Sequence, residues 1–523
     1  NPSPYIDEKN VRLCLHSLMQ SPCRRSTAFT ENLIRRTELR ECPLDIIHTL
    51  LHEYTKKKDL SKARKLLSFI SGHGLQSSPA WAGKIVNLFT HCGSLEDAKQ
   101  AFFRVLRPSI STWYAIIDSH VEFKECKKAL ELYERMLLDT TIEPDRDTFI
   151  KVLKACSLTG FIIHGFHIHD RIIKKGLEQS VIVANTMIDM YGKCGWLDDA
   201  RHVFNKLHDR SVVSWGAMIG GYVQNGHNVH ALTLFQYMMQ QGDCEPNSVT
   251  FSCILKSCGT IKGLEEGQLI HYLVVNFGLE SDIRVETGLI HMYTIARSLE
   301  EAHNIFIRAQ HKDMMCWGAI ISGYVECDSS IGALQLFEEM QHNGLKPDRV
   351  IYICILKACQ NMGSIREGKL VHEKIIKEGL EMNITIGNSL ISMYNMCGSI
   401  GEASNVFNQM LNRDIVSWTS MIAGFVHNEW HFSALNLFGC MQCAKIEPDK
   451  VTYLWTLKSC GHVGCLIHGR FMHDQVIRRG LDSEVMIGCT LVDMYGMVGS
   501  LKEAHTIFDR LPIQNMVSYG IMI

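Results

Sequence analysis

Three features that often identify a protein's class at a glance are missing from this sequence. The charges nearly cancel, since 53 Lys and Arg face 55 Asp and Glu, and the formal net charge is −2. The global basic signature of many nucleic-acid binders is therefore absent, although local clusters such as 56–58 leave room for a basic groove. No apolar run is long enough to span a membrane. No low-complexity linker breaks the chain.

The length and the cysteine content set further bounds. With 523 residues the chain is too long for one compact core, so several domains or a solenoid are expected. The 20 cysteines mostly fall at repeated positions, so reduced, partly buried thiols at helix contacts are favoured over disulfides. The chain begins at Asn1 rather than Met, and a targeting peptide cannot be read from it.

A long internal repeat dominates what is present. Tryptophans stand at 113, 215, 317 and 418, so the successive gaps are 102, 102 and 101 residues. Such regularity predicts stacked repeats. The same spacing is kept by four prolines, four cysteines, four histidines and four tyrosines: Pro144, Pro246, Pro347 and Pro448; Cys156, Cys258, Cys359 and Cys460; His169, His271, His372 and His473; Tyr191, Tyr293, Tyr394 and Tyr495.

Each long period divides into three helical hairpins. One period comprises Val212–Asn247, Ser248–Asp282 and Ile283–Asp313, which are modules of 36, 35 and 31 residues. The next period has 35, 35 and 31 residues. Gly-containing turns separate two apolar-periodic stretches in each module, and Pro347 and Pro448 are expected to end second helices. We predict an all-α chain with an irregular helical cap at 1–43, 14 modules over 44–515, and a truncated repeat at 516–523.

The repeated cysteine and histidine of the middle modules could suggest metal chemistry. Cys258 and His271 are thirteen residues apart and come from different helices of one hairpin. Zinc ligands usually occur as close pairs, and recurrence in four modules favours packing. We therefore expect no metal site and no cofactor.

Several motifs resemble the plant pentatricopeptide repeat family. They are Val212-Val213-Ser214-Trp215, Leu255-Lys256-Ser257-Cys258, and the run from Ile188 to Gly195 that includes Tyr191-Gly192-Lys193-Cys194-Gly195. The 35/35/31 triplet looks like the PLS subclass, whose modules are called P, L and S. Tetratricopeptide repeats have a uniform period of about 34 residues and would not produce this triplet. The resemblance implies a right-handed superhelical solenoid of helix-turn-helix repeats whose groove binds single-stranded RNA, one base per repeat.

The resemblance also implies which side chains contact bases. In P and S modules these are the fifth and the last residue, whereas L modules read poorly. An ionised Asp only accepts hydrogen bonds and suits the imino N–H of uracil or guanine, while Ser or Asn can donate to cytosine or adenine. Four pairs fit the pattern: Asn185 with Ser211 for cytosine, with uracil second, Thr287 with Asp313 for guanine, Asn388 with Asp414 for uracil, and Thr419 with Asp449 for guanine.

Other modules depart from that pattern. The fifth place holds Gly83, Tyr114, Gly216, Gly318 or Cys489, and a glycine offers no side chain to a base. The family's second residue is usually apolar and wedges between bases. The Trp that precedes the fifth residue should point the opposite way, into helix packing. Weaker RNA contacts are expected from second and last residues: Ile182, Val213, Asn247, Met315, Asp348, Val416, Met486 and Asn515.

One short motif superficially resembles a zinc deaminase. His427 and Glu429 are followed by Cys440 and Cys443, and that chemistry needs a His and two Cys on the metal with Glu as proton shuttle. Only ten residues separate Glu429 from Cys440, and all four occupy ordinary places in one hairpin. A chance match is favoured, so no catalytic residue is assigned.

The resemblance thus implies a sequence-selective single-stranded RNA-binding protein that specifies sites of C-to-U editing in organellar transcripts. We expect a mitochondrial or chloroplast location, with the mitochondrion slightly ahead. Other editing or processing proteins are possible partners, and neither a membrane nor a small-molecule substrate is expected. Two alternatives stay open: a protein-interaction solenoid with degenerate RNA recognition, and the targeting part of a deaminase editor whose catalytic end lies outside this chain.

Overall fold

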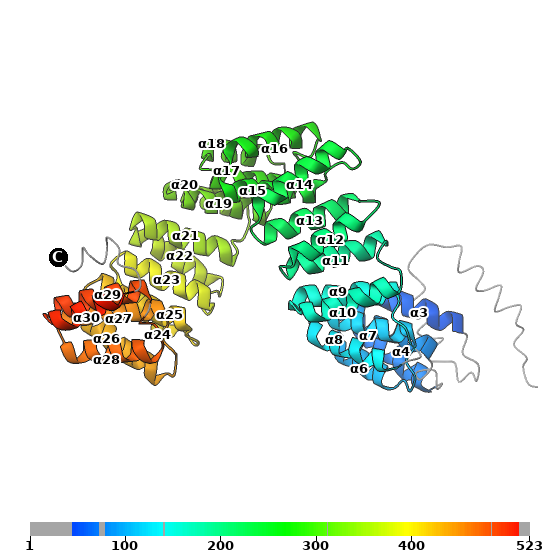
Figure 1. Cartoon of the computed structure of the whole chain (residues 1–523), viewed down its shortest axis with the longest axis horizontal. Helices are drawn as coiled ribbons and strands as arrows, with labels where there is room; N and C mark the ends of the chain where they lie inside the picture. The colour runs from blue at the N-terminus through cyan, green and yellow to red at the C-terminus, as the bar shows by residue number, and fades with distance from the viewer. Residues whose placement is uncertain (1–43, 73–78, 140–141, 311, 483, 512–523) are drawn as a thin grey trace, which may run out of the picture. The chain divides into compact units, whose positions relative to one another are not determined.

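The computed structural model describes residues 44–72, 79–139, 142–310, 312–482 and 484–511. Across these ranges the chain forms 28 α-helices and no strand, so the predicted all-α class is confirmed (Figure 1). None of the described helices is both long enough and apolar enough to cross a bilayer. The expected cap at 1–43, the truncated repeat at 516–523 and Asn515 lie outside the described residues.

The helices group into two compact units, one ending at Cys194 and one beginning at Gly195. The first unit contains α3 (Leu44–Lys57), α4 (Leu60–Gly72), α5 (Pro79–His91), α6 (Leu95–Phe103), α7 (Ile110–Glu122), α8 (Cys126–Leu138), α9 (Arg146–Thr159), α10 (Ile162–Lys174) and α11 (Val181–Lys193).

The second unit opens with α12 (Leu197–Lys206), α13 (Val212–Gln224), α14 (Asn228–Gln241), α15 (Ser248–Ile261), α16 (Leu264–Asn276), α17 (Ile283–Ile295), α18 (Leu299–Arg308), α19 (Met314–Glu326), α20 (Ser330–His342) and α21 (Arg349–Met362). It continues with α22 (Ile365–Lys377), α23 (Ile384–Met396), α24 (Ile400–Gln409), α25 (Ile415–His427), α26 (His431–Cys443), α27 (Lys450–Val463), α28 (Leu466–Arg478), α29 (Val485–Met497) and α30 (Leu501–Arg510).

Within each unit, extensive contacts join only helices that are one or two places apart in the chain. Odd-numbered helices are the first helices of the hairpins. Within each unit they pack on one another and, where the second helix that follows lies in the same unit, on that helix. In the second unit α13, α15 and α17 begin at Val212, Ser248 and Ile283, the residues at which modules were expected to begin. The assignment of these modules to P, L and S classes stays a prediction.

The sequence prediction for the ends of second helices was wrong. α20 ends at His342 and α26 at Cys443, several residues before the prolines expected to stop them. Gly344 and Lys445 have positive φ values of 75° and 58°. A left-handed residue just past a helix end redirects the chain, so Pro347 and Pro448 lie in the loop that leads to the next helix.

Three kinds of aromatic contact join successive hairpins. The first links the second helix of a middle module to the next first helix, where Nδ1 of a histidine shares a hydrogen bond with a tyrosine hydroxyl. The four pairs are His169–Tyr191 at 2.8 Å, His271–Tyr293 at 3.0 Å, His372–Tyr394 at 2.9 Å and His473–Tyr495 at 3.1 Å. The recurring histidine therefore has a packing role.

The second contact links a short module to the hairpin after it. Its four pairs, each edge-to-face, are Phe102–Trp113, Phe204–Trp215, Phe306–Trp317 and Phe407–Trp418, with ring centroids 4.6 to 5.0 Å apart. The expectation that the tryptophans are core residues is confirmed, because all four are buried. The third contact links the remaining junctions through Phe235–Phe251, Phe337–Tyr352 and Phe438–Tyr453.

Small residues and thiols complete these junctions. The recurring cysteines Cys156, Cys258, Cys359 and Cys460 are fully buried. At Gly165, Gly267, Gly368 and Gly469 a Cβ atom would overlap the sulfur of a methionine on the next first helix. The missing side chain at these glycines therefore leaves room for the methionine of the next first helix.

We predict that stability depends on pH through the His–Tyr contacts. Burial lowers the pKa of His271, His372 and His473, so each binds its proton more weakly in the folded protein. The unfolded chain, with imidazole pKa values near about 6.5, then takes up more protons, and stability is lost as pH falls below that value. Thermal unfolding between about pH 7.5 and 5.5 should show a falling midpoint. Replacing the three histidines by glutamine should flatten the dependence, and an unchanged slope would contradict this.

A second prediction compares two neighbours on α19. Trp317 is 0% exposed and packs on Phe306, so Trp317→Ala should cost roughly 3–5 kcal/mol. Met315 is 68% exposed, and Met315→Ala should change stability by no more than about 0.5 kcal/mol. Urea unfolding measures both. An equal loss of unfolding free energy in the two variants would show that the tryptophan does not stabilise the contact between the hairpins.

Candidate nucleic-acid interface

The last residue of most modules is the N-cap of the first helix of the next module. Asp313, Asp348, Asp414 and Asp449 are N-caps whose Oδ1 accepts the backbone N–H of the third helical residue at 2.8 to 2.9 Å. Ser211 and Asn247 cap α13 and α15 through the same position. Such a cap satisfies a backbone donor that the helix leaves without a partner. These side chains are therefore held at fixed places along the array.

The fifth residue of a module lies on the first helix of that module, and its side chain lies near the N-cap formed by the last residue. Asn388 Nδ2 donates to Asp414 Oδ1 at 3.1 Å, and Ser417 Oγ donates to Asn388 Oδ1 at 2.6 Å. The structure thus brings Asn388 and Asp414, a predicted reading pair, into direct contact. Ser417 is the third residue of the following module and ties the two together.

The two guanine-type pairs are joined in the same way. Thr419 Oγ1 lies 2.7 Å from Thr452 Oγ1, and Thr452 donates to Asp449 at 2.6 Å. Thr287 Oγ1 lies 3.1 Å from the Sγ of Cys316, whose backbone N–H donates to Asp313. Sequence analysis missed this third residue, although its small polar side chain and fixed place in the module were visible in the sequence.

Capping uses only one of the two oxygens of each carboxylate. No hydrogen bond from another described residue reaches Oδ2 of Asp313, Asp348, Asp414 or Asp449. Burial raises the pKa of Asp414, but hydrogen bonds from Ser417 and Asn388 outweigh it, and the pKa lies below its ordinary value. Asp414 is therefore ionised at neutral pH and can accept a hydrogen bond from a donor outside the protein.

The remaining predicted pair falls on either side of the division between the units. Asn185 lies on α11 in the first unit. Ser211 lies in the second unit and caps α13 in a reciprocal arrangement with Ser214. Each is described within its own unit.

Exposed apolar side chains occupy the second place of many modules, although Arg284 and Thr385 hold it in two others. The five predicted residues, Ile182, Val213, Met315, Val416 and Met486, are all exposed. The structure adds three that sequence analysis did not name, Val249, Val350 and Val451, at the second place of middle modules. Their signal was the same position in the module. A repeated row of exposed apolar side chains suits contact with flat, partly apolar groups such as bases.

A groove in the second unit brings these features together. Its volume is 610 Å³, and its lining includes Thr287, Asp313, Met315, Gly318, Asp348 and Val350. These are reading and second-place residues of successive modules. A Cβ atom on Gly318 would meet nothing within 4 Å, so the empty reading place there is open space.

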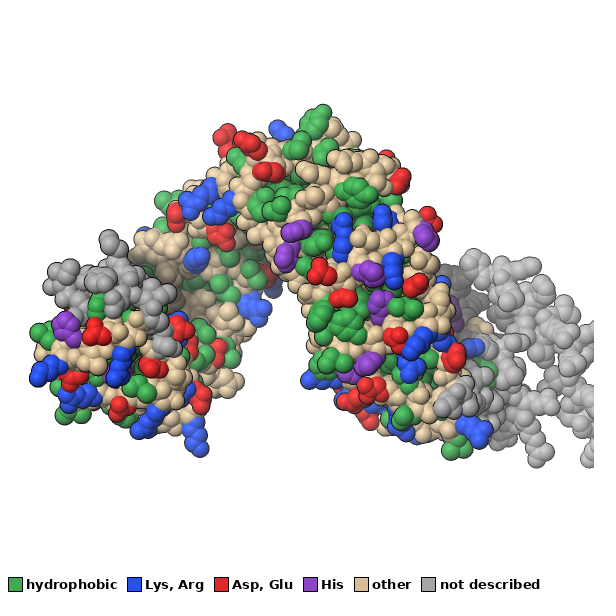
Figure 2. Space-filling model, viewed as in Figure 1, with side chains coloured by type: hydrophobic (Ala, Val, Ile, Leu, Met, Phe, Trp, Pro, Cys, Tyr) green, Lys and Arg blue, Asp and Glu red, His purple; other side chains and the backbone are tan. Residues whose placement is uncertain are grey.

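The electrostatics of this region are mixed. Lys256, Arg284 and His291 also line the groove, and burial lowers the pKa of His291, which favours a neutral imidazole. On the face drawn in Figure 2, basic and acidic side chains are interspersed over both units. Positive charge is therefore supplied locally by single side chains.

Last residues of the middle modules have a different backbone. Asp282, Asn383 and Glu484 have ψ values of 123°, 120° and 120°. Last residues of the other modules of the second unit have ψ values between 164° and 179°. Asp282 accepts from two successive backbone N–H groups, at 284 and 285. The last side chain of a middle module therefore points in a different direction, relative to the helix that follows, from the last side chain of the other modules.

The deaminase-like residues do not form a site. The His427 ring lies against Trp455 at a centroid distance of 4.7 Å. Glu429 has a left-handed φ of 66° in a turn, and Cys440 and Cys443 are exposed on α26. The described residues contain no group of three or more side chains arranged to bind a metal.

Comparison with known proteins identifies the repeats. Models of the PPR repeat family match residues 210–260, the pentatricopeptide repeat domain matches 335–396, and single PPR repeats match 111–139, 182–212, 315–345, 388–415 and 416–446. The crystal structure of the pentatricopeptide repeat protein PPR10 in complex with an 18-nt psaJ RNA element has a TM-score of 0.56. It is 16% identical and covers 98% of this chain and 90% of its own.

Curated relatives from Arabidopsis thaliana extend this match. One pentatricopeptide repeat-containing protein, named as chloroplastic, is 29% identical over 89% of this chain, which spans only 57% of that relative's length. Another chloroplastic relative is 30% identical over 84% of this chain and 71% of its own length. A mitochondrial relative is 30% identical over 90% of this chain and 68% of its own length. The chain belongs to the plant pentatricopeptide repeat family.

Proposed function

We propose that this segment binds single-stranded RNA and reads bases one per module at the fifth and last residues of the P- and S-type modules. The observation that carries the proposal is the triad of Asn388, Asp414 and Ser417, in which a capped carboxylate keeps a free oxygen beside a second polar side chain. An exposed apolar residue, Val416, lies two places after the carboxylate. The polar side chains can thus form hydrogen bonds with the edge of a base, and Val416 can pack on its face.

The comparisons support both the ligand and the location. PPR10, which shares the fold, was crystallised with an RNA element, and this supports RNA as the ligand. Three of the matched relatives carry chloroplastic or mitochondrial in their names, which supports an organellar location. We infer that the protein acts on organellar transcripts and specifies positions for C-to-U editing. In this proposal the repeat array selects the RNA site, and the chemical step belongs to another domain or partner.

The first prediction for this function is a footprint. With the RNA 5′ end at the N-terminal repeats, the reading pairs in module order predict 5′-C-n-n-G-n-n-U-G-3′, where n marks middle modules and modules with glycine at the fifth place. Selection from a random RNA pool followed by sequencing should enrich this pattern. An unrelated motif would reject the base assignment. Absence of any RNA binding would favour a protein-interaction solenoid, which the empty reading place at Gly318 also suits.

A second prediction separates reading from capping at Asp414. Asp414→Ser should move the preference of its module from uracil toward cytosine, because Ser can donate to the cytosine ring nitrogen and Asp cannot. The change in discrimination should be about 1–3 kcal/mol. Stability should change little, since Ser211 closes α13 with the same reciprocal cap that Asp414 forms on α25. Binding of two RNAs that differ only at that base, at one salt concentration, measures the effect.

The matched control is Asp282→Ser. Asp282 also caps a first helix, but it ends a middle module and has the divergent backbone angle. We expect base discrimination by this variant to equal that of the wild type. If Asp414→Ser likewise leaves discrimination unchanged, the carboxylate at 414 caps the helix and does not read RNA.

A further inference from the structure

A second groove lies in the first unit, between the second helices α8 and α10. Its volume is 480 Å³, and Tyr133, Leu137, His164, Ile168 and Arg171 are among its lining residues. The reading positions are at the starts of first helices, whereas this groove is built from second helices. RNA reading therefore does not account for it.

Tyr133 carries a polar atom that the fold does not use. The side chain is only 4% exposed, and its hydroxyl oxygen is buried without a hydrogen-bond partner among the described residues. A buried hydroxyl left without a hydrogen-bond partner destabilises the folded protein. The equivalent positions of three later modules hold Phe235, Phe337 and Phe438, all buried, so packing alone requires only the ring. The added hydroxyl therefore calls for a partner.

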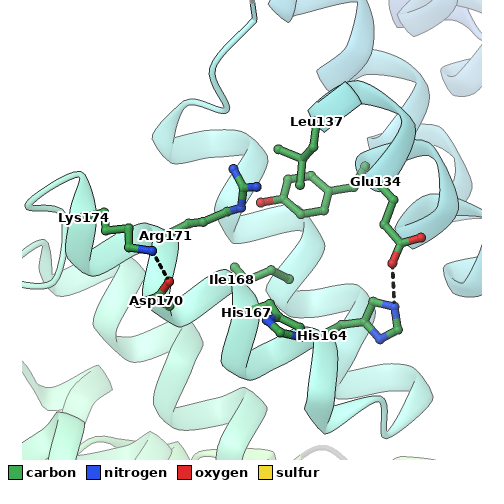
Figure 3. A pocket seen from close by; sticks show the side chains of 9 residues that line it. Glu134, Leu137, His164, His167, Ile168, Asp170, Arg171 and Lys174 are labelled. Atoms are coloured by element: carbon green, nitrogen blue, oxygen red, sulfur yellow. Dashed lines mark hydrogen bonds and ion pairs between the residues drawn. The ribbon is translucent and has the colours of Figure 1, made fainter. Parts of the chain in front are cut away.

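Arg171 supplies the charge beside it. Among the described residues no ion pair involves its guanidinium, whereas Lys174 pairs with Asp170 at 2.6 Å and His164 with Glu134 at 3.0 Å. Figure 3 shows Arg171 extending from α10 toward Leu137 of α8, while those two pairs lie to either side. The two carboxylates at the rim are thus each held by a basic neighbour, and Arg171 remains for a ligand.

The hydroxyl is a donor under all ordinary conditions. Burial raises the pKa of Tyr133 to about 12, although the Arg171 charge acts in the opposite direction. A neutral phenol and a guanidinium are both hydrogen-bond donors, and their natural common partner is an oxyanion, which an arginine can hold through two parallel bonds. Tyr133 and the exposed Arg171 both line the groove, so one ligand group there can lie beside both donors.

We propose that this groove is a binding site for a small oxyanion-bearing molecule, whose phosphate or carboxylate group is held by Tyr133 and Arg171. Leu137 and Ile168 supply an apolar wall for the remainder of the ligand. The volume suits a small organic anion. The site is independent of RNA recognition, so it stands or falls separately from the proposed function.

Isothermal titration of the whole chain with inorganic phosphate and, separately, with acetate tests the proposal at constant ionic strength held by chloride. We expect saturable binding of at least one anion, and the tighter of the two names the ligand class. Tyr133→Phe and Arg171→Gln should each weaken binding about tenfold or more. Tyr133→Phe should keep the fold, since phenylalanine fills the equivalent place elsewhere, and circular dichroism checks this.

Lys374→Gln is the matched control. Lys374 holds the place in α22 that Arg171 holds in α10, but it lies 5.1 Å over the ring of Phe337, where no hydroxyl is present. This variant should bind the anion as tightly as the wild type. Absence of binding to both anions, equal binding by Tyr133→Phe and wild type, or an equal loss in Lys374→Gln would each overturn the proposal.

Discussion

The interface depends on one recurring hydrogen bond, which a backbone N–H in the first turn of a first helix donates to the last side chain of the preceding module. It stabilises the starts of most first helices and fixes a carboxylate or amide at a repeating place. Because a carboxylate has two oxygens, capping occupies one and leaves the other for a ligand. Stability and recognition can therefore share a side chain, and capping by Asp414 does not argue against reading by Asp414.

The aromatic junctions maintain the spacing between these caps. Each kind of junction uses its own pair: histidine with tyrosine, phenylalanine with tryptophan, or phenylalanine with a second aromatic ring. The order of the three kinds repeats along the chain, which explains why the sequence period is about a hundred residues and not one module. The divergent backbone at Asp282, Asn383 and Glu484 follows the same order. It gives a physical reason for middle modules to differ in recognition.

Sequence reasoning predicted the helical class, the family and the burial of the recurring tryptophans, because a repeat shows each position several times. It could not pair His372 with Tyr394, since periodicity shows which residues recur but not which of them touch. It also placed helix ends at Pro347 and Pro448, where left-handed residues end the helices earlier. The third residue of each module was missed because its importance arises from a contact across two hairpins. The individual base assignments stay predictions.

A structure of this protein bound to the oligonucleotide 5′-CAAGAAUG-3′ would test the central claim most directly. The account predicts that Asp414 keeps its bond to the Ser417 backbone N–H through one oxygen and accepts the uracil imino N–H through the other. Val416 should contact a base face in the same complex. An RNA bound away from the helix starts, or an Asp414 that turns out of its cap to reach the base, would contradict the claim that one carboxylate does both.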